Sequence, residues 1–93
     1  MSKMNNIPPA LRPLHPGEIL RTELKARKLA LDVFAERIGM QPSRLNDLVK
    51  GKIPVTIDIA EKLQDVLGID SQSWINLQAQ YDNDLKTIKK WMM

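Results

Sequence analysis

The sequence predicts an all-α fold in which five short helices share one core. Apolar residues recur at helical spacing in five successive segments, and no segment alternates apolar and polar residues as a strand would. Six prolines and four glycines divide the 93 residues into short elements. A hydrophobic content of 43% is sufficient for one compact domain of this length.

An extended N-terminal arm is expected over residues 1–15, because this stretch contains three prolines and has no apolar periodicity. The first helix is expected to begin at Pro16, since proline suits the first helical position and Glu18 favours the positive end of the helix dipole. His15 is the only histidine, so the chain offers it no second imidazole for metal or acid–base chemistry. We therefore assign His15 to the N-cap region of the first helix.

Two further short helices are expected within residues 31–50, joined by a tight turn with Gly39 at its bend. Such turns often need a positive φ angle, which glycine adopts without steric cost. Ala35 is small enough to let the two helices cross closely, and Leu45 and Leu48 would then fix the second helix onto the first. This packing leaves the opposite face of the second helix in solvent.

The fourth helix is expected between Thr56, a good N-cap residue, and Gly68, which suits the C-terminal end of a helix. A fifth helix follows it. The folded domain is expected to span 16–90, with a C-terminal tail at 91–93.

The fifth helix carries an apolar stripe at helical spacing. The stripe includes Trp74, Leu77 and Tyr81. Aromatic residues can stack on the bases of single strands, but in such a stripe they more often form a core or an interface between subunits. The sequence leaves core and dimer interface open for these residues.

The exposed face of the third helix predicts contact with double-stranded DNA. Arginine can bond guanine through two hydrogen bonds in the major groove, and serine can bond bases or phosphates. Lysines beyond the end of the helix are placed to meet phosphates. The residues predicted to contact DNA are Gln41, Pro42, Ser43, Arg44, Asn46, Asp47, Lys50 and Lys52. A solvated helix face would explain the same pattern, and the carboxylate of Asp47 would repel a phosphate unless it accepts a hydrogen bond from cytosine.

The charge distribution is consistent with a polyanionic partner. The net charge is +3, and residues 1–30 carry six cationic but only two acidic side chains. Residues 53–81 carry one cationic and four acidic side chains, so the basic half is the N-terminal one.

The composition excludes most covalent chemistry. Without cysteine there is no disulfide, thiol nucleophile or thiolate metal site, and the isolated glycines form no phosphate-binding loop. No apolar run is long enough to span a membrane, and the first residues do not resemble a signal peptide. We expect a cytoplasmic binding protein that is not an enzyme and needs no cofactor or metal.

Three stretches of the sequence resemble the Cro/repressor-type helix-turn-helix superfamily, and more closely the HigA-type antitoxins of bacterial toxin–antitoxin modules. They are HPGEIL (His15–Leu20), FAERIGMQPSRLNDLVKGK (Phe34–Lys52) and IAEKLQDVLGIDSQSWINLQAQYD (Ile59–Asp82). The resemblance implies a five-helix domain and a homodimer that represses its own operon. It also implies a partner, a HigB-type toxin that is a ribosome-dependent mRNA endonuclease.

The resemblance also implies roles for particular residues. The third helix would be the recognition helix, and Arg44 its principal base-reading residue, because Pro42 stands where some phage repressors carry a base-reading glutamine. Leu31 stands where many members of the superfamily have a glutamine that contacts phosphate. Apart from the resemblance, we expect contact with the toxin on the N-terminal arm and the first helix, because the arm is rich in proline, lacks apolar periodicity and has little evident role in the core.

Three alternatives remain open. The chain could be a regulator of the same fold without a toxin, which the absence of a short, very basic neighbouring reading frame would favour. It could sequester a partner without binding DNA. The third alternative is an enzyme with a carboxylate metal site. This alternative would be favoured if the protein cleaved nucleic acid in the presence of magnesium and lost that activity on mutation of Asp47 or Asp58.

Overall fold

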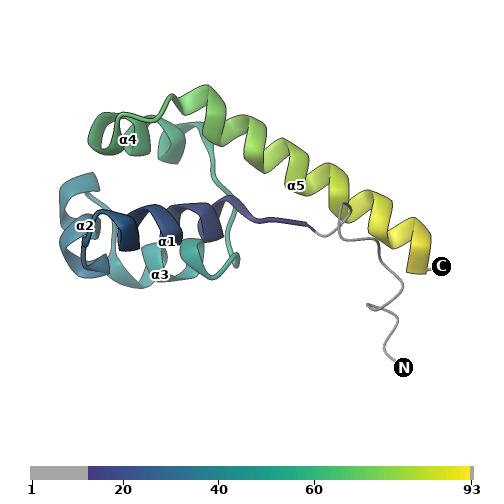
Figure 1. Cartoon of the computed structure of the whole chain (residues 1–93), viewed down its shortest axis with the longest axis horizontal. Helices are drawn as coiled ribbons and strands as arrows, with labels where there is room; N and C mark the ends of the chain where they lie inside the picture. The colour runs from purple at the N-terminus through teal and green to yellow at the C-terminus, as the bar shows by residue number, and fades with distance from the viewer. Residues whose placement is uncertain (1–12, 93) are drawn as a thin grey trace.

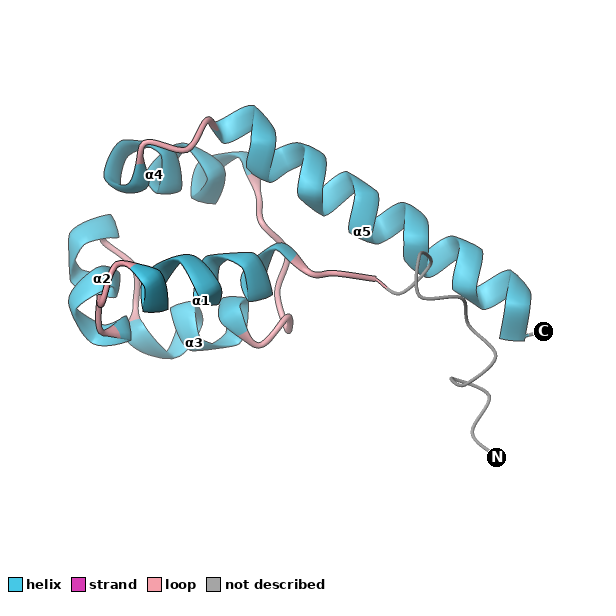
Figure 2. Ribbon diagram, in the orientation of Figure 1, coloured by secondary structure: helices cyan, strands magenta, loops and turns pink. Residues whose placement is uncertain are grey.

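The computed structural model describes residues 13–92, with side chains described through residue 90. The five helices are α1 (Pro16–Ala26), α2 (Leu31–Ile38), α3 (Pro42–Val49), α4 (Ile57–Leu67) and α5 (Ser71–Met92). Throughout this range the helices are joined only by loops (Figure 2), so the predicted all-α, five-helix fold is confirmed. Most of the predicted arm, residues 1–12, lies outside the described part. No helix within that part is both long and apolar enough to cross a bilayer.

The helices form a compact group from which α5 extends (Figure 1). α1, α2 and α3 lie together, α4 packs on α2 and α5, and α5 continues beyond the rest along the longest dimension. Residues 13–92 measure 42 × 25 × 21 Å. α5 includes the backbone of residues 91 and 92, so the helix runs past the predicted boundary at residue 90.

One apolar core joins the helices. Its largest fully buried side chains include Leu20, Phe34, Leu45, Leu63 and Trp74, one from each helix. Each helix contributes the residues that recur every three or four positions, while its polar residues remain outside. Burial of this apolar surface is the main stabilising contribution to the fold.

The ends of the helices follow the local signals in the sequence. Gly39 and Gly68 end α2 and α4 with φ angles of 67° and 74°, in the left-handed region that glycine tolerates best. The Thr56 hydroxyl accepts a hydrogen bond of 3.3 Å from the Ile59 amide at the start of α4. These three boundary predictions are confirmed.

Trp74 lies in the core and exposes only 1% of its surface. Leu77 and Tyr81, from the same stripe, are half-buried. The sequence leaves open whether these residues form the core or a dimer interface. In the structure Trp74 is a core residue, and of the three only Leu77 and Tyr81 have exposed surface that can contact a second subunit.

The first turn of α1 packs backbone against backbone on the last turn of α3. A Cβ atom added to Gly17 would overlap the carbonyl oxygen of Leu48 and lie 3.0 Å from the Cα of Val49. A glycine is therefore needed at this point for steric reasons. The contact fixes the position of α3 relative to α1.

Candidate nucleic-acid interface

α3 has one face in the core and one in solvent. Leu45 and Leu48 are completely buried, and they hold the helix against α1 and α2. On the other side lie the residues that the sequence predicts to contact DNA: Gln41, Pro42, Ser43, Arg44, Lys50 and Lys52 are exposed, and Asn46 and Asp47 are half-buried. The structure thus brings all eight onto α3 and its immediate flanks.

The turn between α2 and α3 sets the direction of this face. The amide of Met40 donates to the carbonyl of Ala35 at 2.9 Å, and the amide of Gly39 donates to that of Glu36 at 3.2 Å. Ala35 is completely buried, as the close crossing of the two helices requires. The small residue, the left-handed glycine and the buried leucine together form the predicted helix-turn-helix arrangement.

The N-terminal end of α3 is free to meet a ligand. Gln41 makes no side-chain capping bond there, and within the described residues the Arg44 guanidinium has no ion-pair partner. The first turn of a helix presents unpaired N–H groups and the positive end of the dipole. Hydroxyl, amide and guanidinium groups can therefore reach outward from this end without breaking internal bonds.

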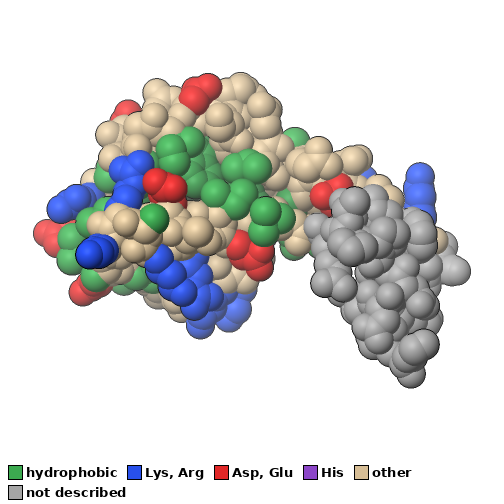
Figure 3. Space-filling model, in the orientation of Figure 1, with side chains coloured by type: hydrophobic (Ala, Val, Ile, Leu, Met, Phe, Trp, Pro, Cys, Tyr) green, Lys and Arg blue, Asp and Glu red, His purple; other side chains and the backbone are tan. Residues whose placement is uncertain are grey.

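The segment after α3 holds its two lysines in fixed backbone positions. The Lys52 amide donates to the Asp47 carbonyl at 2.8 Å, and the Gly51 amide donates to the Leu48 carbonyl at 3.0 Å. Gly51 has a φ angle of 76°, which folds the chain back onto the end of α3. In Figure 3, Lys and Arg side chains gather along the lower edge of the molecule. This basic edge suits a phosphate backbone.

His15 joins three parts of the molecule, which sequence reasoning only partly predicts. Its Nδ1 accepts a hydrogen bond of 2.9 Å from the Gly17 amide, so it is the N-cap of α1 as predicted. Its ring also meets that of Tyr81 edge-on, with centroids 4.7 Å apart, and lies beside Gly51, 3.4 Å from the position of a Cβ atom built there. Only 5% of the residue is exposed. These last two contacts join residues far apart in the sequence.

Burial lowers the pKa of His15 below its ordinary value of 6.5, although Glu18, the Ile53 backbone and Asp82 oppose the shift. A neutral ring is also what the cap requires, because Nδ1 must be free to accept from Gly17. The unfolded chain binds the proton more readily, so acidification favours unfolding. The contribution of His15 to stability is complete above pH 6.5 and is lost as the pH falls through the lowered pKa.

We expect the melting temperature to fall between pH 7 and pH 5.5 because of this residue. In His15→Asn the amide oxygen can cap Gly17 but does not titrate, so the melting curve of that variant should be flatter over the same range. Thermal melts at steps across this range provide the measurement. Parallel pH profiles for the two proteins would show that His15 is not the group responsible.

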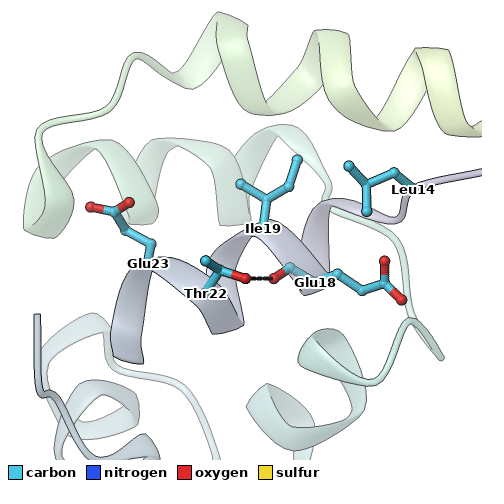
Figure 4. Close-up of a pocket in the computed structure, with 5 residues that line it drawn as sticks. All are labelled: Leu14, Glu18, Ile19, Thr22 and Glu23. Carbon is cyan, nitrogen blue, oxygen red and sulfur yellow. Dashed lines mark hydrogen bonds between the residues drawn. The ribbon is translucent and has the colours of Figure 1, made fainter. Parts of the chain in front are cut away.

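A shallow hollow of about 340 Å³ lies on the exposed side of α1 (Figure 4). It is lined by Leu14, Glu18, Ile19, Thr22 and Glu23. The carboxylate of Glu23 already pairs with Arg27 at 2.8 Å. Among the described residues no group of acidic or imidazole side chains could hold a metal ion.

Comparisons with known proteins agree with this geometry. The Helix-turn-helix family matches residues 20–74. Virulence-associated protein I of Dichelobacter nodosus is 43% identical over 70 residues, which cover 74% of this chain and 65% of that protein. The chain thus spans just under two thirds of the length of that relative.

Two solved structures share the fold. A HigA-family addiction module antidote protein from Coxiella burnetii has a TM-score of 0.80 at 33% identity, with 84% of this chain and 86% of that chain covered. The antitoxin HigA of Pseudomonas aeruginosa, solved with the higBA promoter, has a TM-score of 0.79 at 30% identity, with coverage of 84% and 86%.

The five-helix fold and the outward face of α3 define a helix-turn-helix domain. The chain belongs to the Helix-turn-helix family. Within that family it belongs with the HigA-type antitoxins, which confirms the family that the sequence motifs resemble.

Proposed function

We propose that this protein is an antitoxin and autorepressor, which binds the operator of its own operon as a homodimer and neutralises a HigB-type toxin. The observation that carries the DNA-binding part is the outward face of α3, where Ser43 and Arg44 are exposed at an uncapped helix start. Lys50 and Lys52 flank its other end. This order of groups allows base contacts at one end of the helix and phosphate contacts at the other.

Two copies of α3 would read one operator. A two-fold dimer places its recognition helices about 34 Å apart, so that they enter successive major grooves of a palindromic site. The promoter-bound HigA of Pseudomonas aeruginosa, which has the same fold, supports this assignment. Leu77 and Tyr81 on α5 are the residues we assign to the dimer interface, because they are half-buried in the single chain.

Footprinting on duplex fragments from the region upstream of the gene tests the repressor function. We expect a protected palindrome, with an affinity that falls steeply as salt is raised from about 50 to 200 mM, because each neutralised phosphate releases a counterion. Protection without sequence preference, or none at all, would contradict the repressor assignment.

The toxin partner has its own experiment. Co-expression with the adjacent gene should give a complex that is recovered by pull-down, and this protein should relieve the growth arrest caused by the neighbour alone. We place the toxin contact on the exposed side of α1 and on the arm that precedes it. An adjacent gene that is harmless when expressed alone would contradict the toxin partner and favour the alternative, a stand-alone regulator of the same fold.

A further inference from the structure

A buried side chain of α5 holds the loop that follows α3. Gln78 is only 9% exposed, and its Oε1 accepts a hydrogen bond of 2.8 Å from the amide of Val55. Its Nε2 donates to Oδ1 of Asp82 at 3.0 Å, which fixes the orientation of the amide group. A buried backbone N–H without a partner is costly. Here the partner comes from a helix 23 residues further along the chain.

The same loop is held at its other end. The ring of His15 lies beside Gly51, 3.4 Å from the position that a Cβ atom would take there, and that ring packs edge-on against Tyr81 of α5. Segment 51–55 is therefore connected to α5 twice, directly at Val55 and through His15 at Gly51. Lys52, which is exposed, lies between these two points.

We propose that Gln78 is a positioning residue for DNA binding, which holds segment 51–55 so that Lys52 meets the phosphate backbone. This inference rests on the proposed DNA-binding function. It makes α5 part of the DNA-binding machinery, although Gln78 itself does not touch the duplex. A change in the position of α5 then alters operator affinity through phosphate contacts, which are the same for every sequence.

The coupling acts in both directions. If the bond between Gln78 and Val55 favours DNA binding, DNA binding must stabilise that bond by the same factor. The exchange rate of the Val55 amide hydrogen reports on the bond directly.

Three variants separate this role from general packing. Gln78→Met keeps a side chain of similar length but cannot accept from Val55. The double variant Gln78→Glu/Asp82→Asn exchanges the amide and the carboxylate and so can keep both hydrogen bonds. Gln80→Met is the matched control, since Gln80 makes the same kind of bond, 2.9 Å to Asp84, on the exposed side of α5.

The measurement is the salt dependence of binding to the operator duplex and to an unrelated duplex. For Gln78→Met we expect similar fold losses on both duplexes and a flatter plot of log affinity against log salt, by about one unit for each phosphate that the variant no longer neutralises. Its Val55 amide should exchange faster in the DNA-free protein. The double variant and Gln80→Met should behave as the wild type.

A wild-type salt slope in Gln78→Met would overturn the inference whatever the rate of Val55 exchange, as would a loss confined to the operator. If Gln78→Met does not fold, the wild-type protein provides the test. The inference is overturned if the Val55 amide hydrogen of the wild type exchanges at the same rate with and without bound operator. A wild type that binds no duplex at all would instead remove the proposed function.

Discussion

Gly17→Ala should strongly destabilise the fold. The new Cβ would overlap the Leu48 carbonyl oxygen and lie 2.8 Å from the carbonyl carbon, and both atoms belong to the backbone of α3. Backbone cannot rotate away as the tip of a side chain can, so α1 and α3 must separate. We expect a loss of about 3 kcal/mol in the free energy of unfolding. For a chain of this size, that is a fall of roughly 12 to 24 °C in the melting temperature.

Gly39→Ala is the matched control for this result. No atom lies within 4 Å of a Cβ at Gly39, and its cost is limited to the positive φ angle of 67°. That cost is about 1–2 kcal/mol. If Gly17→Ala melted at or above the temperature of Gly39→Ala, the close approach of α1 and α3 would be contradicted.

Arg44→Ala should weaken operator binding by about 1–3 kcal/mol, roughly 5- to 150-fold, and leave folding unchanged. The side chain is exposed, and among the described residues it makes no ion pair, so its removal breaks no internal ion pair. The effect should be specific to sequence. The variant should lose discrimination between the operator and an unrelated duplex, because a bidentate arginine contact reads guanine. Titration of both duplexes at a fixed salt concentration measures this change.

Lys52→Ala provides the contrast with Arg44→Ala. A phosphate contact carries no sequence information, so this variant should weaken binding to both duplexes by a similar factor and keep their affinity ratio. Unchanged operator affinity in Arg44→Ala would show that this residue does not touch the operator. A changed affinity ratio in Lys52→Ala would place Lys52 among the residues that read bases.

The sequence predicts the helices well because their boundaries depend on local chemistry. Pro16, Thr56 and Gly68 act through dihedral preference and capping within a few residues, and the structure places each where this chemistry requires. The inward face of α3 also follows from periodicity, since Leu45 and Leu48 occupy adjacent turns. Once that face is buried, the outward position of the remaining side chains of α3 follows.

The tertiary contacts that position α3 and segment 51–55 could not be predicted in this way. Periodicity shows which side of a helix is buried, but it does not show which atoms meet across the core. The overlap at Gly17, the ring contact between His15 and Tyr81 and the bond from Gln78 to Val55 each join distant parts of the chain. For Gln78, a polar residue near the apolar stripe of α5 is the only signal in the sequence, and it does not identify the partner.

The orientation of α3 toward a duplex can be tested most directly by mapping the backbone amide resonances of the labelled protein during titration with the operator. We expect the largest backbone amide shifts within residues 41–52, together with a shift of the Arg44 side-chain N–H resonance, and small shifts over the exposed face of α4. Shifts centred on α4, with residues 41–52 unaffected, would contradict the assignment of α3 as the helix that meets DNA.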